Sequence, residues 1–421
     1  MNTLRTVNQL IGILFALCYF YQFVYIPVSW FLKSEKADKT GMTNRYAILI
    51  CARNEENVIA GLIESLKHQT YDQRNLQIFV MADNCTDHTA SIAEAAGAVV
   101  YERKEQALIG KGYALELLLQ NIAADHPEGF DGYFVFDADN VMRSDFIEQM
   151  DRVFSEGHDI VTSYRNSKNF GDNWLSAGYA LWYLRESRYL NHARFLLGTS
   201  CAVSGTGFLF SRKVLEETGG WPFHMLVEDI EFSIDQIVQD KKIAFCKEAE
   251  LYDEQPTTFS QSWRQRMRWT RGYWQVFKAY GLRLIKGIFR GNFSCFDMSM
   301  SIMPAFILST LSIINGIALG IWDARIGGDV MIAVTSIAYL FGEFYAALFV
   351  MGLITAITEW GHIHTETIKK ILYVFTFPLF IFTYIPIALV SLFVNPGWKP
   401  IRHSSAFDPE ALETNPDDPR E

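Results

Sequence analysis

The sequence predicts an α/β protein in which a doubly wound sheet domain is joined to transmembrane helices and to interfacial amphipathic helices. Three observations lead to this prediction. Short apolar runs alternate with helical patterns over residues 44–255, as they do in parallel sheets. Long, mostly uncharged runs flank this segment and can cross a bilayer core of about 30 Å. Basic and aromatic residues alternate over residues 256–292, where the two kinds of sequence meet.

The composition excludes several classes of protein. Half of the 421 residues are hydrophobic, and the formal net charge is −10. Such an acidic chain is a poor match for nucleic acid, so we expect no nucleic acid as a partner. The six cysteines form no Cys-x-x-Cys pair, which argues against a zinc site. The mixture of polar and apolar sequence fits a soluble catalytic domain with a few membrane spans.

Residues 8–32 predict the first transmembrane helix, because they lack charge and are rich in aromatic side chains. A cleaved signal peptide is the alternative, but the apolar part is too long for one and no small-x-small cleavage site follows it. Only Arg5 precedes this span, whereas several lysines follow it. The positive-inside rule therefore places residue 44 onward in the cytosol, as in a multi-pass protein of the plasma membrane.

The domain over residues 44–255 opens with alternating strands and helices. Strands are predicted at 46–50, 77–81, 98–101 and 133–136, and helices at 58–69 and 90–96. A parallel sheet of this kind binds ligands at the carboxyl ends of its strands. The polar residues at those ends include Arg53, Glu55 and Asp83. Taken one at a time, each of them is better explained as a turn or cap residue.

Two further segments carry charge next to the predicted sheet. Lys111 lies between two glycines at a helix start, where a lysine can contact a phosphate. The strand at 133–136 runs directly into Asp137 and Asp139. Two carboxylates aimed at one point are hard oxygen ligands for Mg²⁺ or Mn²⁺, and such an ion can bridge a diphosphate.

Two later motifs bear on catalysis. Gly205, Thr206 and Gly207 form a stretch of small residues in which the backbone can approach a ligand closely. Glu228 and Asp229 open the next predicted helix. Acids at a helix start can simply complement the helix dipole, and one of them can equally serve as a general base.

Basic and aromatic residues alternate from 257 to 290, as in helices that lie in a cytosolic membrane interface. A face for nucleic acid is the alternative. The segment includes the pentad Gln265-Arg266-Met267-Arg268-Trp269, at the junction between the soluble domain and the later spans. We therefore expect a catalytic site that is held against the membrane.

Three transmembrane segments are predicted between residues 298 and 394, at 298–322, 330–357 and 371–394. Glu343 lies near the middle of the second, where an ionisable residue faces a polar path or bonds a neighbouring helix. Pro378 and Pro386 predict a kink or break in the third. Four complete crossings put both termini outside, whereas one broken segment returns the tail to the cytosol. The acidic tail at 405–421 is predicted to be disordered.

In this order the motifs resemble those of the membrane-integrated family 2 glycosyltransferases, which include the cellulose, chitin, hyaluronan and poly-N-acetylglucosamine synthases. The resemblance covers residues 44–395. The matching residues are Ala52-Arg53-Asn54-Glu55, Asp83, Lys111, Asp137-Ala138-Asp139, Ser204-Gly205-Thr206-Gly207, Glu228-Asp229 and the pentad. The resemblance implies a GT-A catalytic domain that uses a nucleotide-diphosphate sugar, most often a UDP-sugar.

The resemblance also implies a role for each matching residue. For the donor nucleotide it implies contacts from Arg53, Glu55, Asp83, Lys111, Asp137, Gln265, Arg268 and Trp269. Asp137 and Asp139 match the site for Mg²⁺ or Mn²⁺. Asp229, beside Glu228, matches the general base, while the metal with Arg268 and Arg266 would offset the charge of the leaving diphosphate. For the acceptor it implies contacts from Gly205, Thr206, Gly207 and Trp269.

Three hypotheses follow. The first is an inverting, processive hexosyltransferase that elongates and exports a β-linked glycan at the inner face of the membrane, with membrane lipids and export or accessory subunits as partners. The second adds one sugar to a lipid such as a polyprenyl phosphate or diacylglycerol. The third is a non-enzymatic scaffold with a decayed transferase domain. The absence of a Phe-x-Val-Thr-x-Lys gating motif after the pentad disfavours a regulated cellulose synthase. The pentad favours processivity, and the intact Asp139 and Asp229 disfavour the scaffold.

Overall fold

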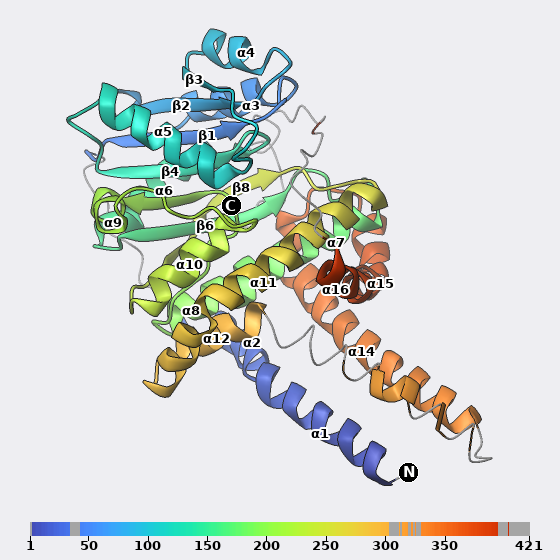
Figure 1. Cartoon of the computed structure of the whole chain (residues 1–421). Coiled ribbons are helices and arrows are strands. Elements are labelled where there is room, and N and C mark those ends of the chain that lie inside the picture. Colours follow the sequence, from blue (N-terminus) through green and yellow to red (C-terminus); the bar gives the residue numbers. More distant parts are fainter. Residues whose placement is uncertain are drawn as a thin grey trace.

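The computed structural model describes residues 2–33, 43–302, 330–394 and His403, with several positions between 311 and 325. Figure 1 shows a sheet domain and a group of helices on one side of it. Helices α1 (Asn2–Tyr19) and α14 (Val330–Thr358) extend away from the sheet on that side. The predicted fold class, a sheet domain joined to helices that can cross a membrane, is confirmed.

The sheet has eight strands in the order β3-β2-β1-β4-β7-β6-β8-β5. Its first half is parallel and consists of β1 (Tyr46–Ala52), β2 (Leu76–Asp83), β3 (Val99–Arg103) and β4 (Gly132–Asp137). In this register Ile48 of β1 lies between Ile78 of β2 and Phe134 of β4. The four strands predicted from apolar runs are present, and their carboxyl ends meet at one edge of the sheet.

The second half of the sheet is mixed. β7 (Phe208–Ser211) runs antiparallel to both β4 and β6 (Ile160–Ser167), while β8 (Ala244–Asp253) runs parallel to β6. The short β5 (Val141–Met142) pairs with β8 in the antiparallel sense. The prediction of a parallel sheet therefore holds for the first four strands only.

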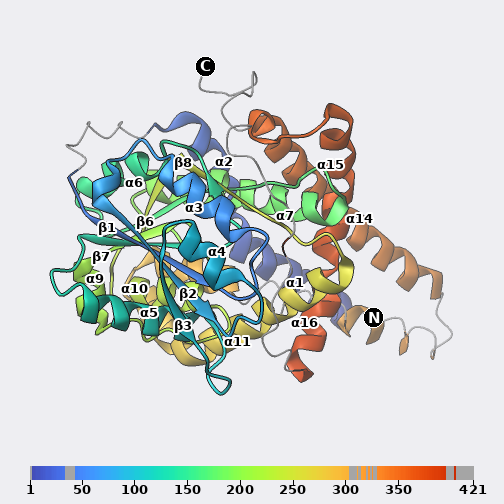
Figure 2. The same cartoon turned by 90° about the horizontal axis from the view of Figure 1, so that it is seen from above.

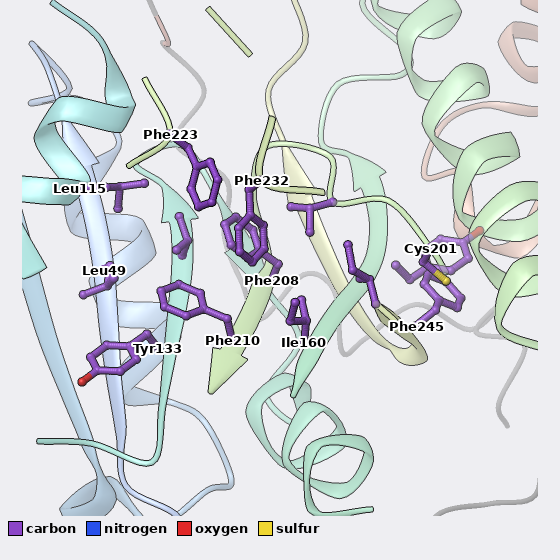
Figure 3. Close-up of a cluster of buried hydrophobic side chains, with 14 of the residues drawn as sticks. Leu49, Leu115, Tyr133, Ile160, Cys201, Phe208, Phe210, Phe223, Phe232 and Phe245 are labelled. Atoms are coloured by element: carbon purple, nitrogen blue, oxygen red, sulfur yellow. The ribbon is translucent and has the colours of Figure 1, made fainter. Parts of the chain in front are cut away.

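Both faces of the sheet are buried. Neighbouring residues of a strand point to opposite faces, and Ile48 and Leu49 accordingly belong to two different hydrophobic clusters. The cluster in Figure 3 joins Leu49 to Leu115 and Phe232. The helices on that face are α5 (Lys111–Asp125), α9 (Arg212–Thr218) and α10 (Glu228–Val238). The other face is covered by α3 (Ile59–Lys67), α4 (Thr89–Ala95) and α6 (Phe146–Ser155).

Helical insertions separate the strands of the second half. Between β6 and β7 the chain forms α7 (Trp174–Arg185), a π-helical turn (Glu186–Asn191) and α8 (His192–Leu196). The Asn173 side chain caps α7 by accepting hydrogen bonds from the backbone nitrogens of Leu175 and Ser176. The insertion places α7 between the sheet domain and the membrane helices (Figure 2).

A single long helix follows the sheet domain. α11 (Phe259–Phe289) has 31 residues and includes the pentad, so the interfacial segment predicted at 256–292 is mainly one helix. It approaches the start of α10 closely, because a Cβ atom on Gly272 would lie 2.7 Å from the Val227 side chain. Gly291 ends the segment with a left-handed φ of 85°, and α12 (Phe293–Ile302) follows. In Figure 1, α11 runs diagonally below the sheet.

Three helices in the described part of the chain are long and apolar enough to cross a membrane: Gln9–Phe31, Phe341–Thr358 and Thr367–Phe393. The first comprises α1 and α2 (Tyr21–Phe31). The second belongs to α14, on which Glu343 is exposed. The span predicted at 298–322 falls partly outside the described residues, and the tail at 405–421 lies wholly outside them.

The third apolar segment is broken at Thr383 into α15 (Thr367–Phe382) and α16 (Tyr384–Phe393). Pro386 lies in the first turn of α16, where a proline removes no helical hydrogen bond. The break predicted from the two prolines is therefore present. Phe380 packs against α7 so closely that a Cβ atom on Gly178 would lie 2.4 Å from its ring.

Candidate active site

One large cavity lies at the carboxyl ends of the parallel strands and continues between the helices that are long and apolar enough to cross a membrane. Its volume is about 760 Å³. The predicted site residues on its wall are Arg53, Glu55, Asp83, Lys111, Asp137, Asp139, Gly205, Glu228, Asp229, Gln265, Arg268 and Trp269. The strand alternation predicts this convergence for the strand ends, whereas the arrival of the pentad depends on the path of α11.

Lys111 links three parts of the site. Its Nζ atom donates to Asp137 Oδ1 at 2.5 Å and to the Gly205 carbonyl oxygen at 2.8 Å. Burial opposes the charge of Lys111, but Asp137 and Glu228 raise its pKa, so the ammonium group stays protonated at neutral pH. Gly112 serves packing instead, because a Cβ atom there would lie 2.0 Å from the Phe223 carbonyl oxygen.

Hydrogen bonds to the Thr206 and Asn140 side chains fix the turn that carries Asp137. The Asp137 backbone nitrogen donates to Thr206 Oγ1 at 2.9 Å and to Asn140 Oδ1 at 3.0 Å. The Thr206 hydroxyl in turn donates to Asn140 Oδ1. These bonds fix the direction in which the Asp137 carboxylate leaves β4.

The three residues predicted to touch the acceptor therefore differ in position. Gly205 lines the cavity with a φ of 85°, and a Cβ atom there would lie 3.7 Å from Asp229 Oδ2. Gly207 faces inward, because a Cβ atom there would lie 1.8 Å from the Leu251 side chain. Thr206 and Gly207 form the turn behind the cavity wall, so of these three residues Gly205 is the one that lines the cavity, and its acceptor contact stays a prediction.

Asp139 is surrounded by positive groups. Its Oδ2 atom accepts a hydrogen bond from the Glu254 backbone nitrogen at 2.8 Å and lies 4.0 Å from His403 Nε2. Burial opposes the charge of Asp139, but His403 and Lys168 lower the pKa of this carboxyl. His403 Nδ1 lies 2.9 Å from Glu55 Oε2. Sequence reasoning missed His403, because it lies far from the other site residues in the chain.

A hydrogen bond connects the loops that follow β1 and β2, near Asp83. Asn54 has a left-handed φ of 59°, and its side-chain oxygen accepts a hydrogen bond from the Thr86 backbone nitrogen at 2.8 Å. The Asp83 carboxylate is buried and accepts a hydrogen bond from Arg103 Nη1 at 2.6 Å. Asp83 therefore reaches the cavity with one carboxylate oxygen already bound and its orientation fixed.

Glu228 and Asp229 lie at the start of α10, close to Lys111. Burial raises the pKa of Glu228 to about 7, and the neighbouring Asp229 adds to this effect, whereas Lys111 and Arg268 oppose it. Burial also raises the pKa of Asp229. A carboxylate with a raised pKa at the wall of a cavity has the protonation behaviour that a general base needs at neutral pH.

Three pentad residues face the cavity from α11. Gln265, Arg268 and Trp269 share one side of the helix because they are three and four positions apart. Arg268 Nη1 donates to the Leu226 carbonyl oxygen at 3.0 Å and so holds the segment before Glu228. The Trp269 ring meets the Tyr179 ring edge-on, with centroids 5.8 Å apart.

Arg266 points the other way and is fully buried. Its Nη1 atom donates to Thr383 Oγ1 at 2.6 Å and to the Phe380 carbonyl oxygen at 3.2 Å, which are groups at the break between α15 and α16. The guanidinium also lies over the rings of Phe380 and Tyr384, at 4.6 and 4.8 Å. The expectation that Arg266 offsets diphosphate charge is therefore wrong, because this side chain joins α11 to the membrane segment.

The part of the cavity below the pentad is apolar. Its wall includes Phe23 and Ile26 of α2, Phe344 and Met351 of α14, and Ile385 of α16. These helices belong to the segments that can cross a membrane. One continuous cavity thus has charged groups at the sheet and hydrocarbon side chains toward the membrane.

The profile of the family described as "Glycosyltransferase like family 2" matches residues 44–272, which is more than half of the chain. The chain belongs to this family. The resemblance that the motifs indicate is thereby confirmed. The matched segment of this family 2 glycosyltransferase includes every site residue predicted from the sequence, whereas His403 and the apolar wall of α14 and α16 lie beyond it.

Two curated relatives of the glycosyltransferase differ in their names. The β-monoglucosyldiacylglycerol synthase of Nostoc sp. (strain PCC 7120) is 27% identical over 279 residues, which cover 63% of this chain and 57% of that protein. The poly-β-1,6-N-acetyl-D-glucosamine synthase of Staphylococcus epidermidis is 23% identical over 272 residues, with coverages of 60% and 61%. The chain therefore spans less than two thirds of the length of these relatives.

A solved structure shares the fold. The mannosyltransferase PcManGT from Pyrobaculum calidifontis, in complex with GDP-Man and Mn²⁺, aligns with a TM-score of 0.58 over 92% of this chain and 99% of that chain. The identity is 17%, so the similarity concerns the fold alone. It supports the prediction of a GT-A fold.

The two aspartates fit a divalent cation in part. Among the described residues, no group of three or more His, Cys, Asp or Glu side chains forms a metal site. Asp137 and Asp139 nevertheless both reach the cavity. Magnesium often binds one or two carboxylates and completes its shell with water and substrate phosphate oxygens. Two hard oxygen donors beside a diphosphate are therefore sufficient for such an ion.

Proposed function

We propose that this family 2 glycosyltransferase is a hexosyltransferase that moves a sugar from a UDP-sugar to an acceptor hydroxyl at the inner face of the membrane. The observation that carries the proposal is the single cavity, which joins the charged strand ends to the apolar faces of α2, α14 and α16. A water-soluble donor fits the first part and a membrane-borne acceptor fits the second. UDP is the nucleotide that the motif resemblance implies.

The transfer uses Asp229 as the general base. In the proposed step Asp229 takes the proton of the acceptor hydroxyl, the hydroxyl oxygen bonds to the anomeric carbon, and the bond from that carbon to the diphosphate breaks. Attack opposite the leaving group inverts an α-linked donor to a β-linked product. Lys111 and Arg268 place two positive charges on the wall of the cavity, where they stabilise the negative charge of the departing UDP.

Asp137 and Asp139 are the residues that would hold Mg²⁺ or Mn²⁺. A bound divalent cation supplies neutralising charge to phosphate oxygens. The protein's own contribution is to hold Asp137 through its backbone bonds to Thr206 and Asn140. Removal of the metal with EDTA is expected to abolish transfer, and readdition of Mg²⁺ or Mn²⁺ to restore it.

A lipid acceptor is favoured by the apolar part of the cavity. Hydrocarbon chains bury favourably against the side chains of α2 and α14, whereas a hydrated glycan gains little from such a wall. The name of one relative, a β-monoglucosyldiacylglycerol synthase, agrees with this choice.

A growing glycan is the second candidate. Trp269 lies on the cavity with its ring fixed by Tyr179, and a flat aromatic face can stack on a sugar. The poly-N-acetylglucosamine synthase among the relatives agrees with this alternative. Processive elongation would then follow, as the sequence motifs predict.

The proposal is tested with purified protein, Mg²⁺ or Mn²⁺ and a panel of UDP-sugars in the presence of extracted membrane lipids. UDP release and the mass of the product are measured. We expect Asp229→Asn to lower the rate at least about a hundred-fold because the base is lost, while UDP binding is kept. Asp235→Asn on the same helix is the matched control, since Asp235 lies outside the cavity wall. Full activity of Asp229→Asn would contradict the proposed mechanism.

A further inference from the structure

Arg185 is a buried cation that the proposed transfer does not use. It is the last residue of α7, directly before the π-helical turn, and its side chain lines the cavity although the residue is only 6% exposed. Its Nη2 atom donates to Gln22 Oε1 of α2 at 2.7 Å. A π-helical turn widens the helix at this point and changes the direction of the side chains around it.

Arg185 lacks the close counter-ion that its neighbour has. Arg194 of α8 is bound by both oxygens of Asp297, at 2.7 and 2.8 Å. For Arg185, no acidic side chain in the described ranges lies within 4.0 Å. Glu186 and, more weakly, Asp297 partly offset the charge of Arg185 from a greater distance. Glu186 itself accepts a hydrogen bond from Ser204 Oγ at 2.5 Å, and Asp297 is bound by Arg194.

The charge of Arg185 is kept despite burial. Burial lowers the pKa of Arg185 to about 10, and the positive Arg194 acts in the same direction. At neutral pH the guanidinium is therefore protonated. A buried charge is unfavourable unless an opposite charge or several hydrogen bonds compensate it. The contacts of the Arg185 guanidinium are the Gln22 amide oxygen and the Trp182 ring, whose centroid lies 5.3 Å away, and neither group carries a negative charge.

The position of Arg185 lies between the two parts of the cavity. Gln22, its partner, lies next to Phe23 on the apolar wall. Toward the sheet, Glu186 follows Arg185 in the chain and accepts a hydrogen bond from Ser204 Oγ. The next residue, Gly205, faces the proposed base, because a Cβ atom there would lie 3.7 Å from Asp229 Oδ2. These contacts connect the segment of Arg185 to the proposed base, while Gln22 connects it to the apolar wall.

We propose that Arg185 binds the phosphate of a lipid acceptor in which the phosphate lies between the hydrocarbon chains and the hydroxyl that receives the sugar. The inference rests on the proposed transfer to a lipid. A planar guanidinium matches a phosphate group with two parallel hydrogen bonds. A hydroxyl beyond the phosphate requires the base Asp229, whereas a phosphate oxygen that attacked directly would require none. Diacylglycerol carries no charge for Arg185 to neutralise.

The product identifies the acceptor directly. Membranes that contain the full-length protein are incubated with labelled UDP-sugars, and the labelled lipid is extracted and analysed by mass spectrometry. We expect a glycolipid that contains phosphorus, with the new sugar on a hydroxyl. A labelled lipid without phosphorus, or one with the sugar on the phosphate itself, overturns the role of Arg185 while leaving transfer to a lipid intact. Label in a non-extractable polymer overturns both proposals.

Two substitutions then test Arg185 itself. The acceptor in these assays is the phosphorus-containing lipid that receives the sugar. Arg185→Gln removes the charge, and Gln22→Glu keeps the guanidinium but gives it a carboxylate partner of nearly the same shape. Both are expected to raise the acceptor KM about ten-fold, with the KM for UDP-sugar within two-fold of its original value. Arg185→Lys is expected to lie between these variants and the unmodified protein.

Arg283→Gln, which changes an exposed arginine on α11, is the matched control and should leave the acceptor KM unchanged. An equal rise in the KM values for acceptor and UDP-sugar assigns Arg185 a structural role and overturns the proposal. A lowered unfolding temperature for Arg185→Gln, with no change in acceptor KM for Gln22→Glu, has the same meaning.

Discussion

At the scale of single residues, the adjacent carboxyls of Glu228 and Asp229 determine how the site responds to pH. Burial raises the pKa of both, to about 7 for Glu228. Transfer requires the ionised form of the base. Because burial raises the pKa of Asp229, protonation removes the base, and with it the activity, at a higher pH than for an exposed aspartate.

We therefore expect the acid limb of kcat/KM against pH to lie above the pH range of an exposed aspartate, with a roughly ten-fold loss for each further pH unit below it. In Glu228→Gln the limb reports Asp229 alone, and it should still lie above the range of an exposed aspartate because burial is the main cause of the raised pKa. The profile is measured by UDP release, and UDP affinity over the same pH range is the control. A limb at or below about pH 4 in both proteins contradicts the raised pKa.

Gly205 and Gly207 have left-handed backbones but different surroundings. A Cβ atom on Gly207 would overlap Leu251, so Gly207→Ala is expected to destabilise the protein by about 2–4 kcal/mol. Gly205→Ala has space at 3.7 Å and should lose only about 1 kcal/mol. Its methyl group would instead face Asp229 and raise the acceptor KM. Thermal unfolding and kinetics of the two variants test this contrast, and an equal loss of stability would contradict it.

At the scale of elements, α11 connects the site to the membrane segment. The side of α11 that carries Gln265, Arg268 and Trp269 faces the cavity, while Arg266 on the opposite side binds the break between α15 and α16. A shift of that break therefore moves the helix that forms one wall of the site.

Thr383→Val tests this connection. The substitution keeps the shape of the side chain but removes the shortest hydrogen bond of the buried Arg266 guanidinium, so we expect a loss of about 1–3 kcal/mol and a lower rate of transfer. Thr376→Val is the control, because the Thr376 hydroxyl only bonds a carbonyl oxygen within its own helix. Unfolding temperature in detergent and UDP release are measured. Similar results for both variants would contradict the connection.

The elements that the sequence predicts well are those with a local pattern. β1, β2 and β4 are buried on both faces and so appear as continuous apolar runs. β7 has only four residues, and β8 contains the exposed pair Lys247 and Glu248, so neither has a recognisable period. Their order in the sheet depends on contacts between distant segments, which no local pattern reports.

The same distinction holds within the site. Asp83, Asp137 and Asp229 lie at strand and helix ends, and their positions follow from the α/β alternation. Arg185 lies inside an apolar helix whose register against α2 is set by tertiary packing. His403 comes after the last apolar helix, and its contact with Glu55 closes a loop of most of the chain. Both residues are visible only once the segments are brought together.

At the scale of the whole molecule, the position of His403 bears on topology. Its side chain reaches Glu55 at the sheet, although it follows α16 in the chain. α15 and α16 pack against α7 and α11, which belong to the sheet side of the molecule (Figure 2). We infer that α15 and α16 form a re-entrant segment that enters the membrane without crossing it. The chain after α16 would then lie on the cytosolic side.

Protease accessibility tests this topology. In intact cells a tag placed before Asn2 should be removed by external protease, whereas a tag placed after His403 should be protected until the membrane is opened. A tag inserted at Gly157, an open turn of the sheet domain, is the cytosolic control. Removal of the tag after His403 in intact cells would contradict the inference, because it would require α15 and α16 to cross the bilayer.

The continuity of the cavity has a consequence for inhibitor chemistry. Because the charged and apolar parts share one wall, a uridine diphosphate joined by a short linker to an alkyl tail would occupy both at once. The second half of such a molecule binds at the high effective concentration that the linker provides. The linked molecule should therefore bind much more tightly than UDP alone or the free alkyl alcohol alone. Selectivity over soluble enzymes that use the same nucleotide would come from the tail.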